Sequence, residues 1–120
     1  SNASLDTPWP KTERLKAAVG ESLASPSDWL TPLARALVHD QPVPDPDLPN
    51  TGVPVDLERA LSSPFVRMAD RAYGTRTSQV VSVRTLSQGF GVTVEEWTHD
   101  PALPVTSLEP ERARRETLVW

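Results

Sequence analysis

Residues 77–98 carry the pattern that decides the fold class, and their sequence is TSQVVSVRTLSQGFGVTVEEWT. Valine, threonine and aromatic residues alternate with polar residues on both sides of a short segment that holds Ser87, Gln88 and Gly89. This composition is typical of two antiparallel strands joined by a tight turn. We therefore expect a β-hairpin over 75–98, together with a short extended segment over 66–68 and an edge strand over 116–120.

The two faces of this hairpin differ in character. Side chains alternate along a strand, so Val81 and Val83 share one face while Arg76, Ser78 and Val80 share the other. The first face has the stronger apolar run and is expected to meet a helix layer. The second is smaller and more polar, as the wall of a wet cleft would be. Apolar residues occur on both faces and a hairpin alone is marginal in water, so we expect another chain or segment to complete the sheet.

Helical spacing precedes the hairpin. A first helix is expected over 10–24, with an apolar stripe of Leu15, Ala18, Val19, Ser22 and Leu23. A second is expected from Ser27, and a third over 55–62. Between the last two, residues 40–52 alternate proline with aspartate and asparagine, which indicates an ordered, polyproline-like strap. The predicted fold class is therefore α+β (α/β in the broad sense), with an antiparallel sheet.

Composition argues against several functions. The net charge is −4, and the densest basic run, which holds Arg112, Arg114 and Arg115, is interleaved with glutamates, so no nucleic-acid partner is expected. The absence of cysteine excludes disulfides and zinc–thiolate sites in this sequence and fits a cytoplasmic location. No apolar run is long enough for a membrane span. His39 and His99 lack metal-ligand spacing, so neither a metal nor another cofactor is expected.

Several motifs occur in a fixed order along the chain. They are Ser1 to Lys11 (SNASLDTPWPK), Leu48-Pro49-Asn50-Thr51-Gly52-Val53, Glu58-Arg59-x-Leu61-Ser62, Phe65-Val66-Arg67 and Tyr73-Gly74-Thr75-Arg76-Thr77-Ser78. Together they span nearly the whole sequence and resemble the NRDE family, also called the transport and Golgi organisation protein 2 family.

The resemblance has consequences for fold and function. That family is similar to N-terminal-nucleophile hydrolases, which stack two antiparallel sheets between helix layers in an αββα sandwich. Its Asn-Arg-Asp-Glu signature and its cysteine beside the initiator methionine lie in the N-terminal half. The resemblance thus implies that residues 1–120 are the C-terminal half of one domain, completed by that N-terminal half or by another copy of the chain. The whole protein would be an amide hydrolase, and this chain alone would be inactive. The alternatives are a non-enzymatic protein that handles haem or lipid and acyl-CoA, and a scaffold.

Candidate site residues follow from the same motifs. Asn2, seven residues before Trp9, is similar to the asparagine that stabilises the oxyanion in the cholylglycine-hydrolase branch. Ser1-Asn2-Ala3 is also typical of what a cleaved expression tag leaves, so its origin stays open. Arg76 could clamp a carboxylate or phosphate of an unidentified small-molecule ligand, or form a sheet-edge salt bridge. Tyr73 and Thr75 are candidate substrate-binding residues, with packing and strand formation as the alternatives.

Overall fold

A computed structural model of the chain describes residues 7–100 and 103–120. The helices are α1 (Pro10–Ala24), α2 (Leu30–Leu37) and α3 (Val55–Ala60), and the strands are β1 (Arg67–Met68), β2 (Tyr73–Gly74), β3 (Thr77–Thr85), β4 (Phe90–Thr98) and β5 (Arg114–Val119). Short 3₁₀ turns lie at Pro26–Asp28, Asp45–Asp47, Ala69–Arg71 and Pro110–Arg112. The predicted α+β class with antiparallel sheets is confirmed.

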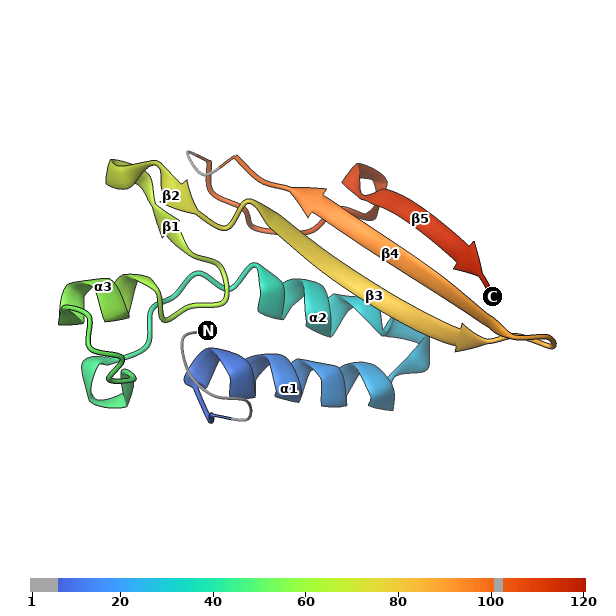
Figure 1. The fold of residues 1–120 in the computed structure, drawn as a ribbon, viewed down its shortest axis with the longest axis horizontal. Helices are drawn as coiled ribbons and strands as arrows, with labels where there is room; N and C mark the ends of the chain where they lie inside the picture. Colours follow the sequence, from blue (N-terminus) through green and yellow to red (C-terminus); the bar gives the residue numbers. More distant parts are fainter. Residues whose placement is uncertain (1–6, 101–102) are drawn as a thin grey trace.

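The main sheet has three strands in the order β3-β4-β5, all antiparallel. Val81 pairs with Val94, and Val94 pairs in turn with Glu116 of β5. The third strand therefore comes from this chain, in the region where an edge strand was expected. A separate short pair, β1 and β2, lies beyond one end of this sheet (Figure 1).

Helices cover one face of the main sheet (Figure 1). Val80, Trp97 and Leu108 form its buried core, and α2 packs against them with an apolar set that includes Leu30, Leu33 and Leu37. The face that carries Ser78 and Val80 was expected to line a wet cleft, and that prediction is wrong. Val80 is only 7% exposed because α2 lies directly on it.

The opposite face of the sheet is exposed. Val81 and Val83, expected under the helices, are 59% and 66% exposed. Val92 and Leu118 are their neighbours across the sheet, and Phe90 lies farther along at 54% exposed. The expectation was based on the number of branched residues in β3 alone. In the structure Trp97, which pairs with Ser78, brings the larger apolar area to the other face, and that area meets the helices.

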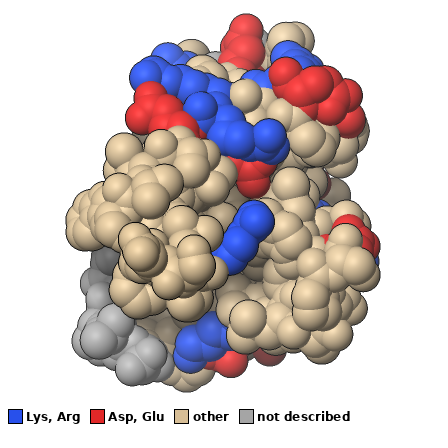
Figure 2. Space-filling model, turned by 90° about the vertical axis from the view of Figure 1, so that its right-hand side faces the viewer, with Lys and Arg blue, Asp and Glu red and all other residues tan. Residues whose placement is uncertain are grey.

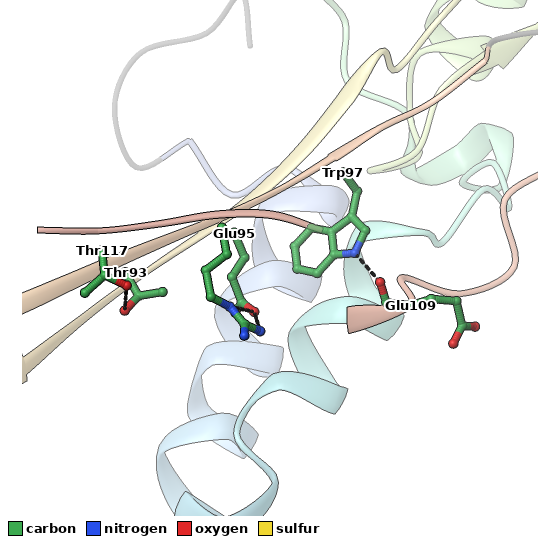
Figure 3. A network of polar contacts seen from close by, with 6 residues as sticks. Thr93, Glu95, Trp97, Glu109 and Thr117 are labelled. Carbon is green, nitrogen blue, oxygen red and sulfur yellow. Dashed lines mark hydrogen bonds and ion pairs between the residues drawn. The ribbon is translucent and has the colours of Figure 1, made fainter. Parts of the chain in front are cut away.

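Polar contacts run along the helix-facing side of the sheet as well (Figure 3). The carboxylate of Glu95, 4% exposed, accepts a 3.1 Å hydrogen bond from Nε of Arg115. The indole Nε1–H of Trp97 donates to the carbonyl of Glu109 at 2.9 Å, which ties β4 to the segment before β5. These contacts satisfy a buried charge and a buried donor on the face of the sheet that meets the helices.

The helix α1 has the predicted bounds but not the predicted burial. Ala18 and Ser22 are buried, whereas Val19 and Leu23 are 47% and 78% exposed. Only one edge of the expected apolar stripe, Ala18 and Ser22, is buried. The reason is that α1 packs beside α2, which is the helix that contacts the sheet.

The proline-rich segment 40–52 holds only the short turn Asp45–Asp47 and is fastened to α3 and the residues after it. The guanidinium of Arg59 donates two 2.7 Å hydrogen bonds to the carboxylate of Asp45, and Ser62 Oγ accepts from the amide of Val43 at 2.8 Å. The backbone of Val43 and the side chain of Asp45 are thus held on either side of Pro44, and the segment forms a wall beside α1.

Candidate functional site

The motif Tyr73-Gly74-Thr75-Arg76 occupies β2 and the turn into β3. Thr75 is held by backbone on both sides: its amide donates to the carbonyl of Val66 at 2.8 Å, and its Oγ1 accepts from the amide of Val66 at 3.0 Å. The side chain of Thr75 therefore supports the β1–β2 pair. The predictions that Thr75 and Tyr73 bind substrate stay predictions.

Arg76 contributes its backbone to the fold, since its carbonyl accepts a 2.8 Å hydrogen bond from the amide of His99. Its side chain is exposed and, within residues 7–100 and 103–120, makes no hydrogen bond or ion pair. Its guanidinium is thus available to a ligand or to another segment, and its binding role stays a prediction. Asn2, the predicted oxyanion residue, lies outside the described residues.

A pocket of about 230 Å³ forms where most of the quoted motifs meet. Tyr73 lines it from β2, Glu58 from α3, and Trp9 and Lys11 from the start of α1. Its remaining lining residues are Pro10, Pro49, Thr51, Val53, Leu61, Ser62 and Val66. Segments far apart in sequence are thus brought together, and Tyr73, 57% exposed, is the predicted site residue that reaches this pocket.

Glu58 and Lys11 are the charged groups of this pocket. Glu58 is 7% exposed, and its carboxylate accepts hydrogen bonds from the amide of Thr51, at 2.6 Å, and from the Thr51 hydroxyl. Nζ of Lys11 donates to the carbonyl of Leu61 at 3.0 Å and lies 5.1 Å from the ring centre of Trp9. Burial lowers the pKa of Lys11, and the negative charge of Glu58 partly offsets this.

This arrangement can bind a polar group that presents an acceptor to Lys11 and a donor to Glu58. Neither residue was predicted from the sequence. The signal for Glu58 was its place in the Glu-Arg-x-Leu-Ser motif, and the signal for Lys11 was its place directly after Trp9-Pro10. Sequence reasoning weighted Arg76 instead, because an arginine beside glycine is a familiar clamp for anions.

Metal binding needs several ligand side chains close together. Within the described residues no cluster of three or more His, Cys, Asp or Glu side chains could hold a metal ion. His99 is buried, and its Nε2 lies 2.9 Å from Ser78 Oγ, while its ring meets Phe65 edge-on at 5.1 Å.

On the face shown in Figure 2, basic and acidic side chains lie next to each other near the top, and most of the remaining surface is uncharged. That face therefore presents no broad basic patch of the kind that nucleic acids need.

No helix in the described residues is long and apolar enough to span a membrane. No curated protein and no solved structure matches the chain. The family model of Transport and Golgi organisation 2 matches residues 1–100, the part that contains all the motifs quoted above and the pocket they form. The chain therefore belongs to the Transport and Golgi organisation 2 family.

Proposed function

We propose that this chain supplies one sheet and one helix layer of an αββα sandwich, and that the complete protein hydrolyses the C–N bond of an amide. The observation that supports this proposal is the asymmetry of the β3-β4-β5 sheet. Helix α2 packs on one face, while the other exposes Val81, Val83, Phe90 and Leu118. A contiguous apolar sheet face is typical of a surface that packs against another layer, and sandwiches bury such faces against a second sheet.

In this proposal an N-terminal half of the same protein provides the second sheet and the nucleophile. A terminal amine would act as the base for its own cysteine side chain, as in N-terminal-nucleophile hydrolases. Asn2, where it is native, would donate to the oxyanion, and Arg76 would bind an anionic group of the substrate. Tyr73 would contact the substrate from the motif-lined pocket.

A second candidate function is non-enzymatic handling of a small molecule, with haem and lipid or acyl-CoA as the candidate ligands. The pocket that holds Lys11 and Glu58 favours it, because convergent polar groups in an apolar concavity are typical of binding sites. At about 230 Å³ the pocket is smaller than the roughly 300–1,000 Å³ of most ligand sites, so it would hold only part of a larger ligand.

The experiment uses the full-length protein and a panel of small amides, with products followed by mass spectrometry. We expect turnover that is lost when the cysteine of the N-terminal half is replaced by alanine. Arg76→Ala should lower kcat/KM by roughly 30-fold or more, since removing a buried charge contact costs about 2–5 kcal/mol. The matched control is Arg84→Ala, which removes an exposed arginine of β3 outside the family motifs.

Each alternative result has a definite meaning. Binding without product would favour the ligand-handling function. Turnover that survives loss of the cysteine would rule out the hydrolase mechanism proposed here. An Arg76→Ala protein that turns over normally but melts much earlier would make Arg76 a structural residue.

A further inference from the structure

Two cavities meet at Arg14 of α1 and His39, which follows α2. The larger, about 640 Å³, lies between the start of α1 and the proline-rich segment, and the smaller, about 440 Å³, lies between α1 and α2. Both are lined by Pro10, Arg14 and His39, so these residues mark their junction. The walls of the larger cavity also include Pro42 and Pro44, whose segment is anchored by the Arg59–Asp45 pair. Together the cavities have the size of a small-molecule site.

Among the described residues the side chain of Arg14 forms no ion pair, and His39 interacts electrostatically with Arg14 and Asp40. Of the other cations of the two helices, Lys16 lies 3.2 Å from Glu13, Arg35 lies 2.7 Å from Glu21, and Lys11 donates to the carbonyl of Leu61. The backbone of His39 is fixed, because its carbonyl accepts from the amide of Phe65 at 3.0 Å. A guanidinium without an ion pair and an imidazole with a fixed backbone therefore line the same junction.

The charges around this junction favour an anion. The pKa of His39 is lowered, first by burial and then by the positive charge of Arg14, while Asp40 acts in the opposite direction. Lys11, one helical turn before Arg14, adds a cation to the wall of the larger cavity. The carboxylates that line this cavity are Glu13, paired with Lys16, and Asp47, whereas Glu21, paired with Arg35, lines the smaller one.

We propose that Arg14 and His39 bind the phosphate group of a small organic phosphate, with the rest of the molecule lying along Pro42 and Pro44. The guanidinium of Arg14 matches two phosphate oxygens in a bidentate contact, and His39 donates to the third. A phosphate dianion balances Arg14 and a protonated His39 better than a single carboxylate does. The site does not include Arg76 or Glu58, although its larger cavity borders the Lys11–Glu58 pocket at Pro10, Lys11 and Ser62. It does not depend on the hydrolase proposal.

Binding at this site is coupled to the proton on His39. A phosphate between the two residues offsets the repulsion from Arg14, so the pKa of His39 rises when phosphate binds. Arg14→Gln also removes that repulsion and raises the same pKa in the free protein. A change in the pKa of His39 alone therefore does not show that phosphate binds. The affinity for phosphate has to be measured directly.

The experiment titrates the full-length protein with inorganic phosphate and, separately, with acetate, and follows the ring resonances of His39 by NMR. We expect saturable shifts with phosphate and at least tenfold weaker binding of acetate, both measured at one pH near 7, where the phosphate dianion is well populated. Arg14→Gln should weaken phosphate binding at least tenfold. Arg35→Gln, which changes an arginine that lines the smaller cavity but is paired with Glu21, should stay within twofold of the unmodified protein.

Arg14→Lys keeps the charge but not the planar fork, and it serves as a second variant should Arg14→Gln fail to fold; it should bind phosphate more weakly than the unmodified protein. The proposal is overturned by non-saturable shifts, by acetate binding as tightly as phosphate, or by folded Arg14 variants that bind phosphate unchanged.

Discussion

Gly74 lies directly against the backbone of Val66, so closely that a Cβ at residue 74 would be 2.6 Å from the Val66 carbonyl oxygen. Gly74→Ala is therefore expected to push β2 away from β1. Overpacking of this kind costs about 1–3 kcal/mol in the free energy of unfolding, which urea denaturation would measure. The control is Gly20→Ala in α1, where nothing lies within 4 Å of the added methyl. It should stabilise by about 0.5–1 kcal/mol, because alanine favours a helix more than glycine does. Equal effects of the two substitutions would contradict the close approach.

Thr75→Val tests the hydrogen bond between Thr75 Oγ1 and the amide of Val66. The substitution keeps the shape of the side chain but leaves a backbone N–H without its acceptor. A loss of about 1–3 kcal/mol in the free energy of unfolding is expected. Thr75→Ser retains the hydroxyl and should lose much less. If both variants were as stable as the unmodified protein, Thr75 would be free to serve the ligand, as the family motif suggested.

Glu58→Gln should lower the pKa of Lys11 further. Burial already depresses this pKa, and the negative charge of Glu58 opposes that effect, so a neutral side chain removes the opposition. The Lys11 side-chain resonances, followed by NMR against pH, give the measurement. Lys16, whose partner is Glu13, provides the control lysine on the same helix. An unchanged pKa of Lys11 would mean that the two residues are not electrostatically linked.

Val80 and Val81 are adjacent residues on opposite faces of β3, and they separate the buried face from the exposed one. Val80→Ala should cost about 1–3 kcal/mol in the free energy of unfolding, because its methyl groups pack against α2. Val81→Ala, at a residue that is 59% exposed, should change it by less than about 0.5 kcal/mol in this chain. In a protein where a second sheet covers Val81, the cost at Val81 should rise to match that at Val80. The comparison thus tests both the face assignment and the proposed sandwich.

The elements themselves could be predicted because local patterns specify them. Pro10 at the first turn and the spacing of Ala18 and Ser22 define α1, and the alternation around Gly89 defines the β3–β4 hairpin. The face of β3 that meets the helices could not be predicted from β3 alone. It depends on Trp97, an aromatic residue on the neighbouring strand whose indole also ties β4 to Glu109. Such a choice follows from cross-strand packing, which alternation within one strand does not contain.

The candidate site was predictable only as a set of motifs. Trp9, Thr51, Glu58 and Tyr73 lie in separate motifs, and their meeting in one pocket depends on how α1, α3 and β2 pack together. Arg14 and His39 lie outside every quoted motif. Their importance arises from the two cavities that they both line, and a sequence pattern does not report such a junction.

The last prediction concerns pH and His99. Burial, followed by the nearby charge of Arg112, lowers the pKa of His99 below its usual value of about 6.5. Its ring is packed against Phe65, and its Nε2 lies 2.9 Å from Ser78 Oγ. As the pH falls below about 6.5, the unfolded chain takes up a proton that the folded protein refuses until its lower pKa is reached. The unfolded state then binds more protons, so the free energy of unfolding should be constant above that pH and fall below it.

His99→Gln should flatten the dependence of stability on pH below about 6.5, although it lowers stability at neutral pH because the contact with Phe65 is lost. His39 also has a lowered pKa, so His39→Gln is the matched control. It should remove only the contribution of His39 to the slope of the free energy of unfolding against pH. Urea denaturation at intervals of half a pH unit gives the slopes. A His99→Gln protein that retains the full slope would place the titrating group elsewhere. A slope of opposite sign would mean that folding favours the protonated ring, as it would if Asp100 rather than burial controlled His99.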